Sequence, residues 1–137
     1  MSYTLTDFFD EYMFRGRLSP TQTVFSLDIF EYNQKTGLFV ASGNEAGILS
    51  AIVGKITPDT EAQANIKFRQ IPAPEYERME KQIIYRGHII KTKNDVQLKA
   101  RRDESHYSLE LIVCLKGGGL VYPGWMDNAV RVELPKK

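Results

Sequence analysis

Residues 61–71 read Glu-Ala-Gln-Ala-Asn-Ile-Lys-Phe-Arg-Gln-Ile and form the most regular stretch of the chain. Apolar side chains stand at positions 62, 64, 66 and 68, and polar side chains stand between them. Successive side chains of a β-strand point to opposite faces, so this alternation indicates a strand with one buried face and one face in water. Strands of this kind are typical of antiparallel sheets.

Similar segments flank this strand on both sides, and turn-forming residues separate them. Gly37, Pro58 and Asn94 stand at short connections, where glycine, proline and asparagine are favoured. Strands that follow one another at a spacing of about ten residues predict consecutive antiparallel hairpins. The expected strands cover residues 24–32, 38–42, 48–57, 61–71, 83–91, 96–101, 107–115 and 130–134.

The N-terminal residues follow a different period. Phe8, Tyr12 and Met13 lie on one stripe at helical spacing, and Gly16 is suited to end a helix. The sequence therefore predicts an N-terminal helical segment within residues 1–20.

These elements together predict an all-β, mainly antiparallel fold in a single domain of residues 1–137. We expect residues 21–137 to form an up-and-down β-barrel or strongly curved sheet of about eight strands, since closure removes exposed edges. A helical turn is possible after Pro74, between the fourth and fifth expected strands. In architecture the chain resembles the calycin-type barrels, lipocalins and avidin-like proteins among them. The resemblance concerns the fold alone and carries over no ligand residues.

Composition excludes several classes of function. The chain has 18 basic and 17 acidic residues and a net charge of +1, a balance that argues against a nucleic-acid partner. Its apolar runs are far shorter than the about 20 residues that span a bilayer, and its first residues lack the pattern of a signal peptide. We therefore expect a cytoplasmic protein that does not bind a membrane.

Neither a metal site nor a catalytic site is evident from residue spacing. Cys114 is the single cysteine, and it stands in an apolar strand where a buried side chain is expected. His88 and His106 are not spaced as metal ligands. We predict no metal, no cofactor and no catalytic residue.

The hairpin order assigns each connection to one end of the barrel. The loop at residues 43–47, the connection at 72–81, the turn at 103–105 and the N-terminal segment are expected at the same end. Loops on a rigid scaffold commonly form binding surfaces, so a ligand site is expected there. By parity, the candidate ligand-binding residues that point inward near this end are Phe25, Gln70, Tyr85, Arg102 and Tyr107.

Arg102 is the most informative of these candidates. It continues the apolar face formed by Val96, Leu98 and Ala100, and a cation inside a barrel is costly unless it is paired. One interpretation is that Arg102 binds an anionic ligand through its guanidinium fork. The other is that the strand ends there, and that Arg102 reaches water or pairs with Glu104.

Three hypotheses for the function follow. The first is a non-catalytic binding protein that holds a small, partly apolar and possibly anionic ligand at the barrel end near Arg102. The second is a protein-interaction module, such as an inhibitor, an immunity-type protein or a homo-oligomer subunit, with a filled barrel core. The third is a small barrel enzyme, an isomerase or cyclase, in which Arg102 and Tyr85 or Tyr107 stabilise an oxyanion.

Overall fold

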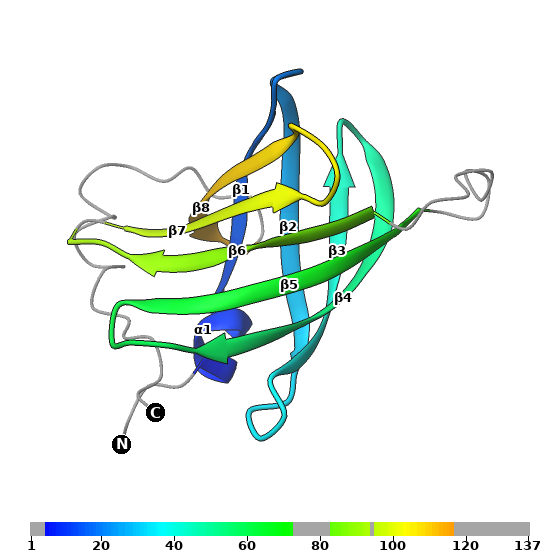
Figure 1. Ribbon diagram of the computed structural model, residues 1–137. Coiled ribbons are helices and arrows are strands. Elements are labelled where there is room, and N and C mark those ends of the chain that lie inside the picture. The colour runs from blue at the N-terminus through cyan, green and yellow to red at the C-terminus, as the bar shows by residue number, and fades with distance from the viewer. Residues whose placement is uncertain (1–4, 73–82, 94, 117–137) are drawn as a thin grey trace.

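The computed structural model describes residues 5–72, 83–93 and 95–116. A short helix opens this part of the chain, and an antiparallel β-barrel follows it (Figure 1). The elements are α1 (Leu5–Glu11), β1 (Tyr12–Ser19), β2 (Thr23–Tyr32), β3 (Leu38–Glu45), β4 (Ile48–Pro58), β5 (Gln63–Pro72), β6 (Ile83–Lys91), β7 (Val96–Arg102) and β8 (Ser108–Leu115).

Each strand pairs antiparallel with the next one, and the last pairs with the first. The closing register runs from Tyr12 opposite Leu115 to Ser19 opposite Ser108. The described strands therefore form a closed barrel in the order β1 to β8. The predicted fold class, an up-and-down barrel of eight antiparallel strands with a short N-terminal helix, is confirmed.

The predicted extent of the N-terminal helix is wrong. The helix ends at Glu11, and residues 12–19 form β1. Within β1, Phe14 and Leu18 are buried with Gly16 between them, which is the period of a strand. Pairing with both β2 and β8 satisfies the backbone of this segment, and a helix extended to Gly16 would leave the barrel open.

Two further expectations fall outside the part of the chain that is described. These are the strand at residues 130–134 and the helical turn after Pro74. The segment at residues 130–134 is one of the eight strands expected from the sequence. In the described barrel the eight strands include β1 instead, and the barrel closes by pairing of β1 with β8.

Helix α1 covers one end of the barrel, beside the turn between β2 and β3 (Figure 1). Leu5, Phe8 and Phe9 are buried there, and the ring of Phe9 lies 5.4 Å from that of Tyr32 at the end of β2. The sequence placed this segment at the opposite end, with the loop at residues 43–47. That placement is wrong because β1 lies between the helix and β2, and one extra strand moves the helix to the other end.

Apolar side chains from every strand fill the barrel interior in one continuous cluster. Phe14, Phe25 and Phe68 are among its largest members and are almost completely buried. Complete burial of a side chain of this size contributes about 1.5–3 kcal/mol. The described interior is therefore a packed core, and the polar groups that point inward gather at one end of it.

Close packing of β6 on β7 depends on Gly87. It faces Ala100 across the two strands, and a Cβ atom at Gly87 would overlap the backbone carbonyl of Lys99. Any larger side chain would push the strands apart at this point.

We predict that Gly87→Ala lowers the free energy of unfolding by about 1–3 kcal/mol, the usual cost of excess volume in a packed region. Urea denaturation would measure the change. Ser42→Ala, on the exposed face of β3, is the control and should leave stability within about 0.5 kcal/mol of the original chain. An equally stable Gly87→Ala variant would contradict this packing.

Candidate functional site

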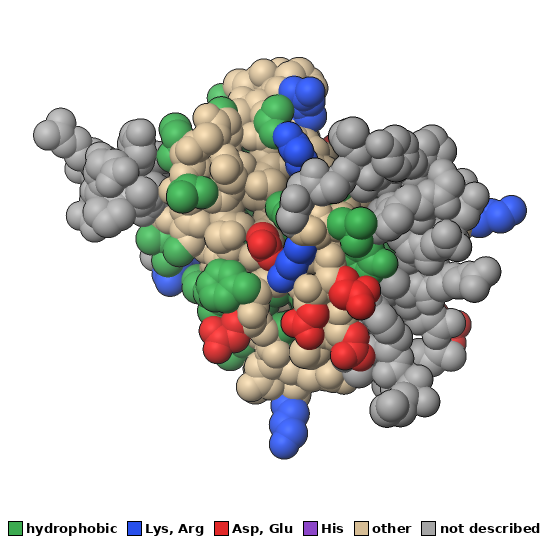
Figure 2. Space-filling model, turned by 180° about the vertical axis from the view of Figure 1, so that it is seen from behind, with side chains coloured by type: hydrophobic (Ala, Val, Ile, Leu, Met, Phe, Trp, Pro, Cys, Tyr) green, Lys and Arg blue, Asp and Glu red, His purple; other side chains and the backbone are tan. Residues whose placement is uncertain are grey.

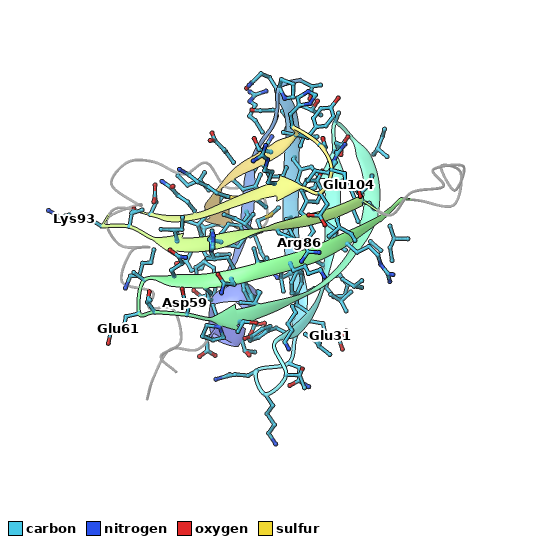
Figure 3. All side chains as sticks on the ribbon, in the orientation of Figure 1. Glu31, Asp59, Glu61, Arg86, Lys93 and Glu104 are labelled. Carbon is cyan, nitrogen blue, oxygen red and sulfur yellow. The ribbon has the colours of Figure 1, made fainter. Side chains whose placement is uncertain are left out.

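The end of the barrel opposite α1 carries the polar side chains that point inward. We call this end the mouth; the turns between β1 and β2, β3 and β4, and β7 and β8 surround it. Figure 3 shows Glu104 at the β7–β8 turn, at the other end of the sheet from Asp59 and Glu61. The inward side chains of the mouth that carry polar atoms are Glu45, Ser50, Gln70, Tyr85, Arg102 and Tyr107.

Arg102, the last residue of β7, is held by two tyrosines. Its Nε and Nη2 atoms donate to the hydroxyl oxygen of Tyr85 at 3.1 and 2.7 Å. The guanidinium carbon lies 4.5 Å from the ring centre of Tyr107 and 5.3 Å from that of Tyr85. These contacts fix the cation in one position, and cation–π contacts of this kind stabilise a partly buried guanidinium.

Arg102 forms no ion pair with a described residue. No carboxylate among these residues lies within 4.0 Å of its nitrogen atoms. Glu104, the partner suggested as an alternative from the sequence, is exposed in the following turn with a φ of 57° and forms no ion pair with it. The mouth thus holds an immobilised cation with no directly paired carboxylate among the described residues, and the charge of Glu45 in the same mouth acts at longer range.

Tyr85 connects Arg102 to the packed core. Its side chain is completely buried, and its ring stacks on Phe68 at 5.0 Å and meets Phe25 edge-on at 6.4 Å. Burial raises the pKa of its hydroxyl above 10.0. The hydrogen bond and the charge of Arg102 lower this pKa, and the charge of Glu45 raises it, but burial has the largest effect. The phenol is therefore neutral at physiological pH.

Gln70 and Ser50 form a second polar pair near the mouth. The Nε2 atom of Gln70 donates to the Oγ atom of Ser50 at 3.1 Å, and both side chains are buried. The Oε1 atom of Gln70 is buried and has no hydrogen-bond donor among the described residues. A buried oxygen without a donor costs about 1–3 kcal/mol.

The structure brings most of the predicted site residues together. Arg102, Tyr85, Tyr107 and Phe25 form one chain of contacts, as their parity suggested. Gln70 lies at the same end, but its side chain forms a hydrogen bond with Ser50 and not with any of these four residues.

Two mouth residues were missed from the sequence. Glu45 and Ser50 continue the inward parity of β3 and β4, but the glycines at 43 and 47 obscured the parity of both strands.

The other reactive residue types stand apart from the mouth or on its rim. His88 points outward, with its Nδ1 atom close to the side chains of Gln63 and Asn65. His106 is exposed and stacks on Tyr107 at 5.2 Å. Burial raises the pKa of the Cys114 thiol, which therefore stays protonated at neutral pH.

The described residues offer no candidate for a metal site or for a membrane-spanning helix. They contain no cluster of three or more histidine, cysteine, aspartate or glutamate side chains placed to hold a metal ion. They also contain no helix with the length and apolar character needed to cross a membrane.

Comparison with known proteins gave no match to a family model, to a curated protein or to a solved structure.

We predict that the raised pKa of Tyr85 makes stability sensitive to alkali. The folded state holds this proton more tightly than the unfolded state, so stability is complete below pH 10 and falls as the pH rises through and above 10. Tyr85→Phe should weaken this fall, because one such group is removed. At pH 8 the variant should be less stable by about 1.5–3 kcal/mol, since Arg102 loses its acceptor.

Urea denaturation of both proteins at pH 8 and at several values above pH 10 would measure these effects. Tyr12 and Tyr32, whose pKa values burial also raises, are present in both proteins, so the difference between them reports Tyr85. Identical pH dependence in the two proteins would contradict the assignment.

Proposed function

We propose that this chain is a non-catalytic binding protein whose mouth takes a small ligand with a carboxylate or phosphate group. The single observation that carries the proposal is the state of Arg102. Its guanidinium is partly buried, is fixed by Tyr85 and Tyr107, and has no carboxylate within 4.0 Å among the described residues.

An anion would complete the interactions of this arginine. A guanidinium presents five donors in a fixed fork, and two of its nitrogen atoms are directed to Tyr85. The remaining donors suit a carboxylate or phosphate oxygen, and a cation already removed from bulk water binds an anion more strongly than an exposed one does.

The surroundings of Arg102 define the rest of the ligand. The ring of Tyr107 supplies an aromatic surface beside the guanidinium. The core below the mouth is packed, so the ligand would lie across the barrel end and not deep in the interior. A small anion with an attached apolar or aromatic group fits this description.

The proposal predicts binding of benzoate or phenyl phosphate that depends on Arg102. Isothermal titration of the full chain should show at least tenfold weaker binding to Arg102→Gln, because about 1.4 kcal/mol of binding energy corresponds to tenfold in affinity. The control is Arg101→Gln, on the outward face of the same strand, which should bind as the original chain does.

Two outcomes would overturn the proposal. One is equal affinity of the original chain and Arg102→Gln for these anions. The other is absence of binding of both anions by the original chain. Circular dichroism of each variant would establish that it retains the barrel.

A protein-interaction module is the second candidate, and the packed core together with exposed apolar side chains favours it. Phe30 in β2 and Leu49 in β4 are 61% and 62% exposed. Large exposed apolar side chains are common at sites of association.

This candidate predicts self-association or capture of a protein partner. Native mass spectrometry at micromolar concentration should then detect a dimer or larger species, and Phe30→Ser or Leu49→Ser should reduce it. A strict monomer in both the original chain and these variants would remove the homo-oligomer form of the candidate.

A further inference from the structure

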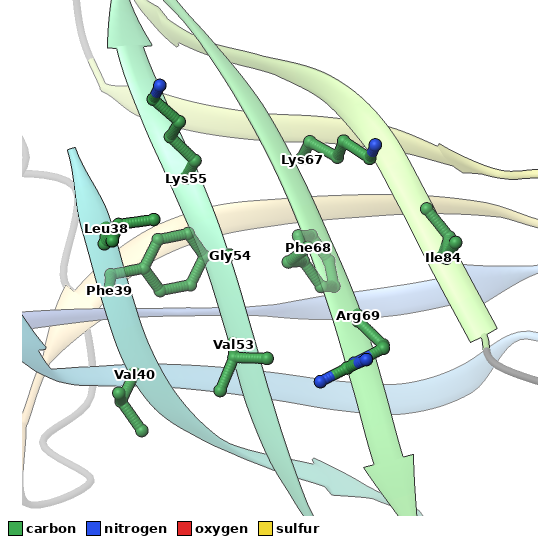
Figure 4. A pocket seen from close by; sticks show the side chains of 10 residues that line it. All are labelled: Leu38, Phe39, Val40, Val53, Gly54, Lys55, Lys67, Phe68, Arg69 and Ile84. Carbon is green, nitrogen blue, oxygen red and sulfur yellow. The ribbon is translucent and has the colours of Figure 1, made fainter. Parts of the chain in front are cut away.

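The outer wall of the barrel carries an apolar groove that is separate from the mouth. It has a volume of about 640 Å³ and crosses β3, β4, β5 and the start of β6 (Figure 4). Volumes of about 300–1,000 Å³ are usual for small-molecule sites. The groove is lined by Leu38, Phe39, Val40, Val53, Gly54, Lys55, Lys67, Phe68, Arg69 and Ile84.

Strand register explains the arrangement of this groove. Val40, Val53, Arg69 and Ile84 lie opposite one another in a row across four strands. Gly54 follows Val53 on the inward side, where a Cβ atom would lie 2.6 Å from the Cβ atom of Phe68 and 2.8 Å from the ring of Phe39. The glycine therefore allows β4 to lie close against these rings beneath the groove.

The same register places like charges side by side along the groove. Leu38, Lys55 and Lys67 form the next row, in which the two lysines are direct neighbours. This row continues to Arg86, which lies opposite both Lys67 and Arg101. Like charges directly opposite one another across strands are destabilising. Lys55 and Lys67 therefore repel each other, and an anion bound beside them would relieve this repulsion.

Counter-ions are scarce among the residues of this wall that the structure describes. Among the described residues, none of Lys55, Lys67 and Arg69 has a carboxylate within 4.0 Å, and the nearby Arg86 pairs with Asp103 at 3.0 Å. The outward positions of β4 to β7 include no aspartate or glutamate. Figure 2 shows acidic side chains gathered on the lower half of the opposite face. Among the described residues, basic side chains thus prevail on the groove wall, although the net charge of the whole sequence is only +1.

We propose that this groove binds an amphiphile with one alkyl chain and an anionic head group, either a carboxylate or a phosphate. The alkyl chain lies on Leu38, Val53 and Ile84, and the head group lies against Lys67 and Arg69. The apolar lining of the groove suits the alkyl chain. Its basic side chains, with no acidic residue in the lining, suit the anionic head group. The site is distinct from the mouth, so it does not depend on the function proposed for Arg102.

The test compares amphiphiles that share a chain and differ in the head group. Laurate, dodecyl phosphate and the uncharged dodecyl maltoside would be titrated calorimetrically into the full chain, each below its micelle concentration. We expect at least one of the two anions to bind at least tenfold more tightly than the maltoside. The difference should shrink in high salt, because salt screens exposed charges. Laurate and dodecyl phosphate also distinguish a fatty-acid ligand from a phosphate ester.

Variants on the exposed wall separate the two parts of the groove. The double variant Lys67→Gln and Arg69→Gln should bind the anionic amphiphiles at least tenfold more weakly, with little change for the maltoside. Leu38→Ser, at a position that is 56% exposed, should weaken binding of all the dodecyl compounds. The control is Arg101→Gln, on the same wall but outside the groove, which should bind within twofold of the original chain.

Several results would overturn the proposal. One is absence of binding of laurate and dodecyl phosphate, including the case in which the chain captures an acidic amphipathic peptide instead. Another is unchanged affinity in the double variant. A loss of amphiphile binding in Arg102→Gln would place the ligand in the mouth and would also overturn the groove assignment. Failure of benzoate and phenyl phosphate to bind bears on the mouth alone.

Discussion

The antiparallel pairing of β1 with β8 closes the sheet and fixes the direction in which every side chain points. Once these strands are joined, each strand of the barrel has a hydrogen-bonded neighbour on both sides, and no edge is left open along the paired segments. The alternation of side chains then divides the protein into a packed interior and an outer wall. Both candidate sites depend on this division, because one lies where inward parity reaches the barrel end and the other lies on the outward parity of β3 to β6.

The two ends of the barrel differ in chemistry for the same reason. At one end, the helix before β1 places Leu5 and Phe8 over the core and closes it with apolar contacts. At the other end, the strands continue past the apolar layers and place the partly exposed Arg102 and Tyr107 where water or a ligand can reach them, while the side chains of Tyr85 and Gln70 stay buried. The core supplies stability. In the mouth, the Oε1 atom of Gln70 has no hydrogen-bond donor and the guanidinium of Arg102 has no ion pair among the described residues.

Much of the fold could be predicted from alternation alone. The segment at residues 61–71 and the series from Val96 to Arg102 have one strict period, and both are strands of the barrel. Residues 12–19 were misread because Phe8, Tyr12 and Met13 also fit the helical period. That choice depends on tertiary pairing with β8, which lies far away in the sequence.

The candidate sites show the same limit. Parity was sufficient to gather Arg102, Tyr85, Tyr107 and Phe25, because all four lie on the inward faces of clearly alternating strands or at their ends. The outer groove could not be predicted, because it requires the register that sets Lys55 beside Lys67 and Val53 beside Arg69. Register follows from turn geometry and packing across strands, which composition and net charge do not reveal.

Closure by the first and last strands also determines the order of events during synthesis. β1 leaves the ribosome before the other strands of the barrel, but the strand that must hydrogen bond to its free edge is made only after the intervening six. The local hairpins can form in turn, whereas the final ring closure must overcome the entropy of joining distant segments. Until then the nascent chain presents two unpaired strand edges, so the interval before β8 is complete is when it is most exposed to pairing with other chains.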